Sequence, residues 1–116
     1  MLAPGADAKI YLCTGYTDMR KGIAGLSSLA QSCRLNQIET GALFVFRGKR
    51  ADKMKILWWD GQGFCLFYKR LERGQFTWPQ ACDSTSLGIT RAQLMMLLEG
   101  IDWRRPSWSK APEYLG

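Results

Sequence analysis

The stretch from Phe44 to Pro79 restricts the fold more than any other part of the chain. Short runs of aromatic and β-branched residues alternate in it with glycine-containing breaks. Strands joined by tight reversals, about ten residues apart, are the usual source of this pattern. We therefore predict an antiparallel β-meander in this stretch.

The reversal at Asp60-Gly61-Gln62-Gly63 sets the register of the two longest strands, because glycines tolerate the positive φ angles of a tight turn. If Trp59 faces Phe64, the next pairs on the same face are Leu57–Leu66, Lys55–Tyr68 and Lys53–Arg70. The opposite face then carries Met54, Ile56, Trp58, Cys65, Phe67 and Lys69. We predict that Trp58 and Phe67 belong to the core, and the pattern leaves Trp59 and Tyr68 open.

Helical periodicity appears on either side of the meander. Thr17 or Asp18 can cap a helix that carries an apolar stripe: Met19, Ile23, Leu26, Ala30 and Cys33. Arg20 and Lys21 would then lie in its first turn. Thr90 and Gln93 form a capping-box pattern before a second apolar face made of Leu94, Leu97, Leu98 and Ile101, with Gly100 near the helix end.

The remaining segments complete an α+β fold. We expect strands at 9–14, at 42–46 and at 75–78, and a loop over 80–88. The predicted fold is an antiparallel β-meander of about four to five strands packed with two helices. The 116 residues form one domain, 1–116, with a compact part at about 9–103 and a tail, 104–116, that orders on binding.

Composition excludes several classes of function. No apolar run approaches the roughly 20 residues of a membrane span, and the N-terminus lacks a secretory leader, so we expect a cytoplasmic protein without a membrane partner. Cys13, Cys33, Cys65 and Cys82 form no CxxC pair, and the chain has no histidine. We therefore expect no zinc site, no disulfide, no cofactor and no histidine-dependent nucleophile.

Positive charge is concentrated in the meander. Between Phe44 and Pro79, eight basic side chains oppose three acidic ones, which gives +5 of the chain's total of +6. Cations among aromatic residues are typical of nucleic-acid binding. The expected DNA contacts, on a basic two-stranded arm that stands clear of the core, are Arg47, Lys49, Arg50, Lys53, Lys55, Lys69 and Arg70, with Arg20 and Lys21 at the helix start.

Each basic group also has a simpler interpretation. The loop between the first two strands of the meander can be a solvated tip that protects the sheet from aggregation. Arg20 can pair with Asp18 or Asp60 instead of a phosphate. The second helix can pack on the sheet or, through its methionines, present a surface for a protein partner.

Catalysis by carboxylates is less well supported by the sequence than nucleic-acid binding. Asp18, Asp60 and Glu72 could hold a divalent metal for phosphodiester cleavage. Each also suits a structural role, in capping, in a turn or in pairing with a basic side chain. We therefore predict no catalytic residues and no enzymatic activity.

Several runs are similar in order and spacing to a known family. They are Tyr16–Gly22, Gly41–Phe46, Trp59–Phe64, Tyr68–Leu71 with Phe76–Pro79, and Leu98–Trp103. Over about Ile10 to Pro106, the chain resembles the accessory TnpB proteins encoded by the second reading frame of the sixty-six-type bacterial insertion sequences. The resemblance implies a protein that assists transposition by a separate transposase, with no established catalytic residue and no cofactor. The expected partners are DNA and that transposase; docking of the transposase without DNA contact is the alternative.

Overall fold

A computed structural model gives the structure of residues 8–33, 41–79 and 86–101. Five strands and two helices follow one another in these ranges: β1 (Ile10–Tyr16), α1 (Ile23–Cys33), β2 (Leu43–Arg47), β3 (Lys53–Trp59), β4 (Phe64–Arg70), β5 (Ser86–Ile89) and α2 (Arg91–Leu98). The predicted α+β class is therefore confirmed. None of the helices in the described ranges has the length and apolar character that crossing a membrane requires.

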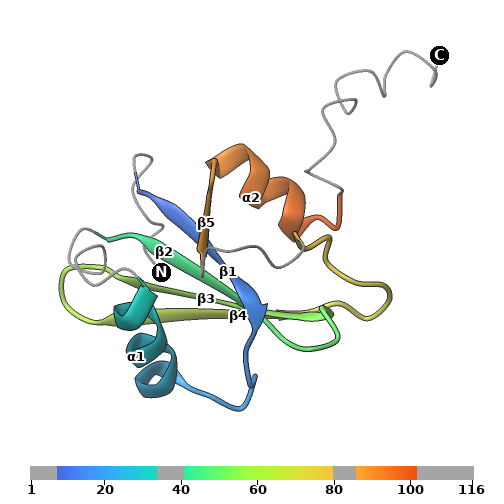
Figure 1. Ribbon diagram of the computed structural model, residues 1–116. Helices are drawn as coiled ribbons and strands as arrows, with labels where there is room; N and C mark the ends of the chain where they lie inside the picture. Colours follow the sequence, from blue (N-terminus) through green and yellow to red (C-terminus); the bar gives the residue numbers. More distant parts are fainter. Residues whose placement is uncertain (1–7, 34–40, 80–85, 102–116) are drawn as a thin grey trace.

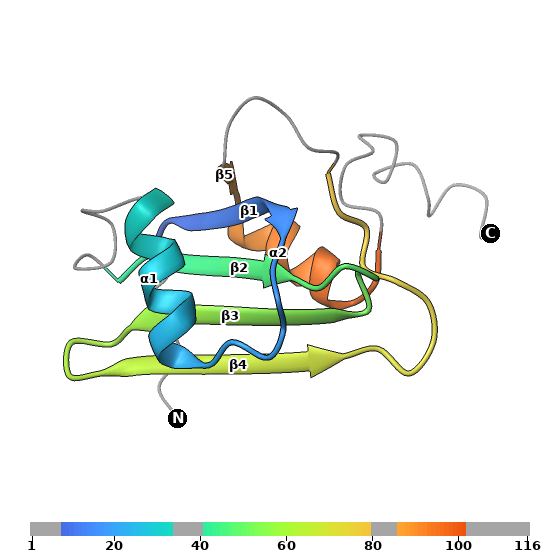
Figure 2. The same cartoon turned by 60° about the horizontal axis from the view of Figure 1, so that its bottom comes forward.

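The strands form one sheet in the order β4-β3-β2-β1-β5 (Figures 1 and 2). The meander β2-β3-β4 is antiparallel, as is the pair β1–β5. The pair β1–β2 is parallel, which the prediction of a purely antiparallel sheet did not include. The chain returns through α1 to the end of the sheet where β1 began, so the two strands run in the same direction.

The register of β3 and β4 is the one that the turn predicts. Trp59 lies opposite Phe64, and the pairing continues without a break to Lys53 opposite Arg70. Gly61 supplies the positive φ angle, 99°. Asp60 completes the turn, because its carboxylate accepts hydrogen bonds from the backbone N–H groups of Gln62 and Gly63.

Helices cover both faces of the sheet, α1 on the near side and α2 on the far side in Figure 2. The core beneath α1 contains Cys13, Leu26, Ala30, Ala42, Phe44, Phe46 and Leu57. The core beneath α2 contains Ile10, Leu12, Leu43, Val45, Met54, Ile56, Trp58, Phe76, Trp78, Leu94 and Leu97. Trp58 is buried as predicted, whereas the prediction for Phe67 is wrong. Phe67 lies on the edge strand β4 and is 37% exposed.

Helix α1 begins at Ile23, later than predicted. Asp18 does not cap the helix; instead its carboxylate accepts a hydrogen bond from the backbone N–H of Arg20, which closes a local turn. Arg20 and Lys21 therefore precede the helix. Within the helix Leu26 and Ala30 are fully buried, as the stripe predicts, but Ile23 is 42% exposed.

Two other segments differ from the prediction. Residues 75–78 form no strand; they cross the end of the sheet, where Phe76 N–H donates to the carbonyl of Ala51 and the Trp78 indole donates to the carbonyl of Cys13. Strand β5 occupies 86–89, which overlaps the expected loop over 80–88, and pairs with β1 at the sheet edge. The expected tail, 104–116, lies outside the described residues.

Helix α2 starts as predicted. The side chain of Thr90 accepts from the N–H of Gln93, and the side chain of Gln93 accepts from the N–H of Thr90. Leu94 and Leu97 are buried, and Gly100 takes a positive φ of 78° just past the helix. The predicted apolar face ends earlier than expected, because Ile101 is 48% exposed.

We expect Leu26→Ala to destabilise the protein by about 2–5 kcal/mol, since it leaves a cavity between α1 and the sheet. Ile23→Ala on the same helix is the matched control and should change the free energy of unfolding by about 0.5 kcal/mol or less. Urea denaturation followed by tryptophan fluorescence measures both. Equal losses would contradict the helix orientation described above.

Candidate nucleic-acid interface

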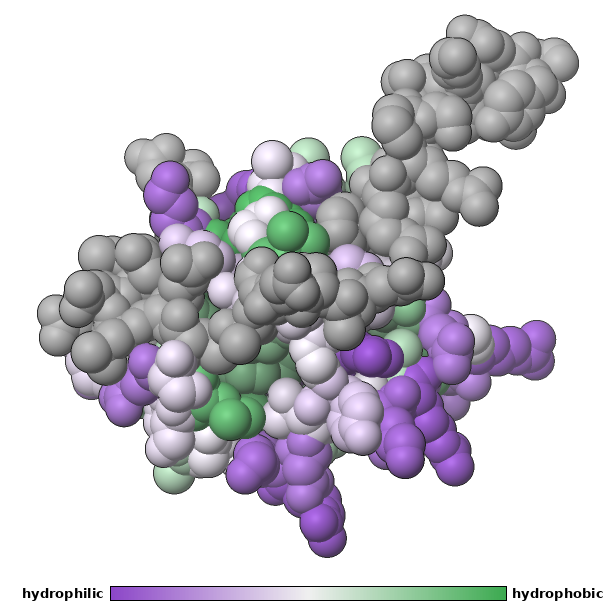
Figure 3. All heavy atoms as spheres, viewed as in Figure 1, coloured by the Kyte–Doolittle hydropathy of each residue, from purple (hydrophilic) through white to green (hydrophobic). Residues whose placement is uncertain are grey.

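One end of the sheet gathers most of the predicted basic residues. Strands β1, β2 and β4 end there and β3 begins there, so Arg47, Lys53 and Arg70 lie at neighbouring strand ends. The β2–β3 loop adds Lys49 and Arg50. We call these five residues the basic end. Hydrophilic side chains project around these loops in Figure 3, in the same view as Figure 1.

The β2–β3 loop is tied to the rest of the molecule. Gly48 N–H donates to the carbonyl of Lys53, and Ala51, in a left-handed conformation with φ 60°, donates to the carbonyl of Gly48. The segment after β4 donates three further hydrogen bonds to backbone carbonyls of the loop. The N–H groups of Leu71 and Phe76 donate to Asp52 and Ala51, and the side-chain amide of Gln75 donates to Arg50. The expected arm standing clear of the core is therefore wrong; the basic loop is held against the sheet end.

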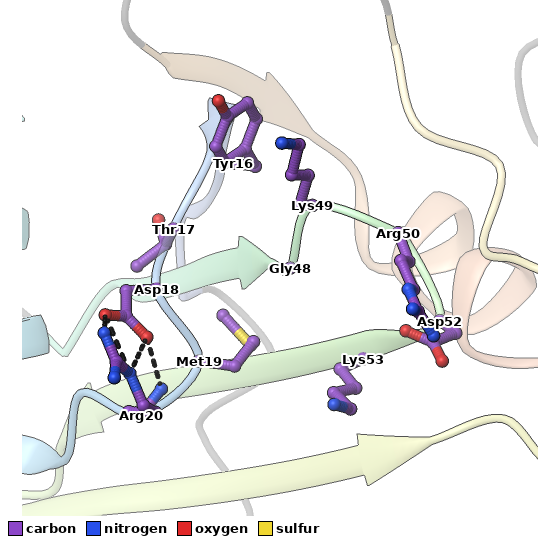
Figure 4. A pocket seen from close by; sticks show the side chains of 10 residues that line it. All are labelled: Tyr16, Thr17, Asp18, Met19, Arg20, Gly48, Lys49, Arg50, Asp52 and Lys53. Atoms are coloured by element: carbon purple, nitrogen blue, oxygen red, sulfur yellow. Dashed lines mark hydrogen bonds and ion pairs between the residues drawn. The ribbon is translucent and has the colours of Figure 1, made fainter.

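A hollow of about 470 Å³ lies between this loop and the segment that follows β1 (Figure 4). Its walls come from residues 16–20 on one side and from 48–50, 52 and 53 on the other. Met19 and Gly48 lie close together: a Cβ atom at position 48 would be 2.9 Å from Cγ of Met19. Only glycine lets the two segments approach this closely without a shift of Met19.

Four residues of the basic end keep their charged groups near solvent. Lys49, Arg50 and Arg70 are exposed and Lys53 is half-buried. The ammonium group of Lys49 lies 5.8 Å from the centre of the Tyr16 ring. Arg47 is half-buried, and its Nε is buried without a hydrogen-bond partner among the described residues.

Lys55 and Lys69 have structural partners inside the fold. Lys55 is 8% exposed, and its Nζ donates to the carbonyls of Met19, at 2.8 Å, and Lys21, at 2.9 Å. Its ammonium group also lies 4.9 Å from the centre of the Tyr68 ring. Lys69, on the opposite face, donates to the carbonyl of Leu98 at the end of α2. A cation there interacts favourably with the helix dipole. Both ammonium groups are therefore engaged with backbone carbonyls inside the fold.

Arg20 forms an ion pair with Asp18. Of the two interpretations of Arg20 drawn from the sequence, a phosphate contact or an ion pair, this is the simpler one. The closest contact between the two side chains joins Nη2 to Oδ2 at 2.7 Å, and Nε of Arg20 donates to both carboxylate oxygens. These hydrogen bonds from Arg20 hold the pKa of Asp18 well below its usual range. The pair therefore stabilises the folded state above about pH 4, and this contribution is lost as the pH falls through the lowered pKa. Lys21 is exposed beside the pair.

The three candidate metal ligands are not brought together. Asp18 lies at the basic end, whereas Asp60 lies in the β3–β4 turn at the other end of the sheet. The hydrogen bonds that Asp60 accepts, first from Gln62 and Gly63, lower its pKa. Glu72 is exposed after β4. Within 8–33, 41–79 and 86–101, no group of three potential metal ligands occurs, and Cys13 and Cys65 are free thiols.

Tyr16 is the site residue that sequence reasoning missed. It is 61% exposed and lines the hollow. The expected strand stopped at Thr14, but β1 continues through Gly15 with an irregular register before Tyr16 pairs with Arg47. A glycine inside a strand often marks such a bulge, which can redirect a side chain. Gly15 was therefore the sequence feature that could have predicted the bulge and the exposed position of Tyr16.

We expect Lys55→Met to destabilise the protein by about 1–3 kcal/mol, because the carbonyls of Met19 and Lys21 lose their buried donor. Cleavage by trypsin after Arg20 and Lys21 should become faster as the segment loosens. Lys53→Met is the matched control on the same strand and face, and it should leave both the urea midpoint and the cleavage rate nearly unchanged. An unaltered cleavage rate in Lys55→Met would mean that other contacts hold the segment.

Comparison with known proteins agrees with the resemblance seen in the sequence. The model of the family described as IS66 Orf2 like protein, TnpB_IS66, matches residues 8–108. The chain is 45% identical to the uncharacterized protein y4hO of Sinorhizobium fredii over the full length of both proteins. It is 36% identical to y4jC of the same organism over 90% of this chain and 89% of that protein. No solved structure matches. The chain belongs to the IS66 Orf2-like family of transposition-associated accessory proteins.

Proposed function

We propose that this protein is a non-catalytic accessory factor that binds the DNA backbone through its basic end and thereby assists a separate transposase. One observation carries the proposal. Lys49, Arg50, Lys53 and Arg70 surround a single end of the sheet, and the part of the chain that the structure describes places no carboxylate within salt-bridge distance of them.

The charge around the hollow supports an anionic ligand. Four cations line it, Arg20, Lys49, Arg50 and Lys53, against the two acids Asp18 and Asp52, a net charge of +2. Arg20 and Asp18 neutralise each other, so the remaining excess comes from the β2–β3 loop and Lys53. Like charges held close together repel, and phosphate groups relieve that repulsion while releasing their own counterions. Polyanion binding is thus the favourable use of this surface.

Lys55 and Lys69 are not part of the proposed contact set, because their ammonium groups already donate to backbone carbonyls. Arg47 contributes at most through the outer part of its half-buried guanidinium group. Lys21 and Arg20 lie on the segment across the hollow and can extend the surface. The proposed set is therefore smaller than the nine residues expected from the sequence.

A second candidate function, docking of the transposase without DNA contact, is favoured by a different surface. On the α2 side of the sheet, Met95 is 53% exposed and Phe67 is 37% exposed. Both line an apolar hollow of about 160 Å³ between α2 and the sheet. Pull-down of the purified transposase in the presence of nuclease tests this function. Loss of capture in Met95→Glu, with capture kept in Lys49→Glu, would support it.

DNA binding should depend strongly on salt. About five phosphate contacts on a duplex predict a slope of roughly −4 to −5 in a plot of log K against log salt. Mobility-shift titrations on element-end and random duplexes at several salt concentrations measure the slope. An affinity that does not respond to salt would remove the electrostatic basis of the proposal.

Reversing the charge of one lysine tests whether DNA binds at the basic end. Lys49→Glu should weaken duplex binding several-fold and make the salt slope shallower, because one attraction becomes a repulsion. Lys9→Glu is the matched control: it makes the same change in net charge, but Lys9 is exposed just before β1, at the opposite end of the sheet. If both variants lose the same affinity, binding follows net charge and not the basic end.

A further inference from the structure

Tyr16 has an unusual position for a large aromatic side chain. It lies at the rim of the hollow, 61% exposed, next to Lys49 and on the same wall as the Asp18–Arg20 pair (Figure 4). The core beneath α1 uses other aromatic rings, among them Phe44 and Phe46. Tyr16 therefore adds little to the core and is available to a ligand.

The contact between Lys49 and Tyr16 leaves the ring available. Their separation of 5.8 Å is close to the outer limit of about 6 Å for a cation–π interaction, and such contacts contribute little at exposed sites. Lys49 is itself exposed. A planar group can stack on the ring while the ammonium group turns to a neighbouring phosphate.

The walls of the hollow suit such a planar group. The side chain of Met19 provides an apolar surface between the cations, close to Gly48. The volume of about 470 Å³ falls within the roughly 300–1,000 Å³ typical of small-molecule sites. One nucleobase with its sugar and phosphate is a ligand of this size class.

The same geometry does not suit insertion into a duplex groove. The major groove admits a helix or a two-stranded ribbon that projects from the protein. Here the tip of the β2–β3 ribbon is bonded to the segment after β4 through Asp52, Ala51 and Arg50. A base inside a duplex, moreover, is stacked on its neighbours and cannot enter a hollow beside Tyr16.

We propose that the hollow is a binding site for single-stranded DNA, in which an unpaired base stacks on Tyr16 while adjacent phosphates contact Lys49, Arg50 and Lys53. The inference rests on the proposed function and specifies the form of DNA. Basic grooves with aromatic stacking platforms bind single strands with little sequence preference, because every base has a flat face. Single strands are therefore preferred over duplexes at this site.

Fluorescence anisotropy with the full chain tests the inference. The probes are one labelled mixed-sequence DNA strand, the same strand annealed to its complement, and an RNA strand of the same sequence, all at one salt concentration. The native protein should bind the DNA strand more tightly than the duplex. Tyr16→Leu should weaken single-strand binding roughly 5- to 150-fold, the range for loss of one base–aromatic stack, and change duplex binding by about twofold or less.

Two further variants make the result specific. Tyr16→Phe keeps an aromatic ring and should retain single-strand affinity. Phe67→Leu is the matched control, since Phe67 is 37% exposed but lies on the opposite face of the sheet and does not line the hollow, and it should leave affinity nearly unchanged. Unaltered urea midpoints for the two Tyr16 variants would show that the fold is intact.

The outcomes separate the two proposals. If duplex and single strand bind in a salt-dependent manner but neither responds to Tyr16→Leu, or if Phe67→Leu has the same effect, the single-strand site is wrong and backbone binding stands. Tighter binding of the duplex, or of the RNA strand, also overturns the inference. If none of the three probes binds at low salt, the proposed function itself fails.

Discussion

Burial of both faces of the central strands is the constraint on which the rest of the structure depends. In the central strand β2, Leu43, Phe44, Val45 and Phe46 are all buried, so neither face of this strand meets water. A helix must then cover each face, which α1 and α2 do. Polar side chains on the sheet consequently lie mainly at the ends of the strands and on the edge strands, and Lys55 within β3 is an exception. The cations of the basic end lie at such strand ends and in the adjoining loop, where Lys49, Arg50 and Arg70 are exposed.

Lys55 shows how the core and the candidate site are connected. It stands on a buried strand face, where an unpaired ammonium group would be costly. The carbonyls of Met19 and Lys21 satisfy it, and in doing so they hold the segment between β1 and α1 across the sheet. That segment forms one wall of the hollow. Lys55, one of the DNA contacts expected from the sequence, thus holds one wall of the hollow in place through these two hydrogen bonds.

Local patterns made part of this structure predictable. The glycines of the β3–β4 turn predicted its register, and Thr90 with Gln93 predicted the start of α2. Most of the predictions that were wrong depend on contacts between residues far apart in the sequence. The partners of Lys55 lie 34 and 36 residues away, and the parallel pairing of β1 with β2 depends on the whole crossover. The predicted start of α1 was wrong for a local reason, because Asp18 closes a turn with Arg20 instead of capping the helix. At the site, charge indicated the β2–β3 loop, but the bulge that exposes Tyr16 was not recognised.

The basic end and the apolar surface of α2 do not compete for space. The hollow beside Tyr16 is built from loops at one end of the sheet, whereas Met95 on α2 and Phe67 on β4 line the hollow between α2 and the sheet. The hydrogen bonds that fix the β2–β3 loop keep its cations in place before any ligand arrives, so binding there loses little conformational entropy. Under the two proposals, DNA and the transposase therefore occupy separate surfaces of the protein.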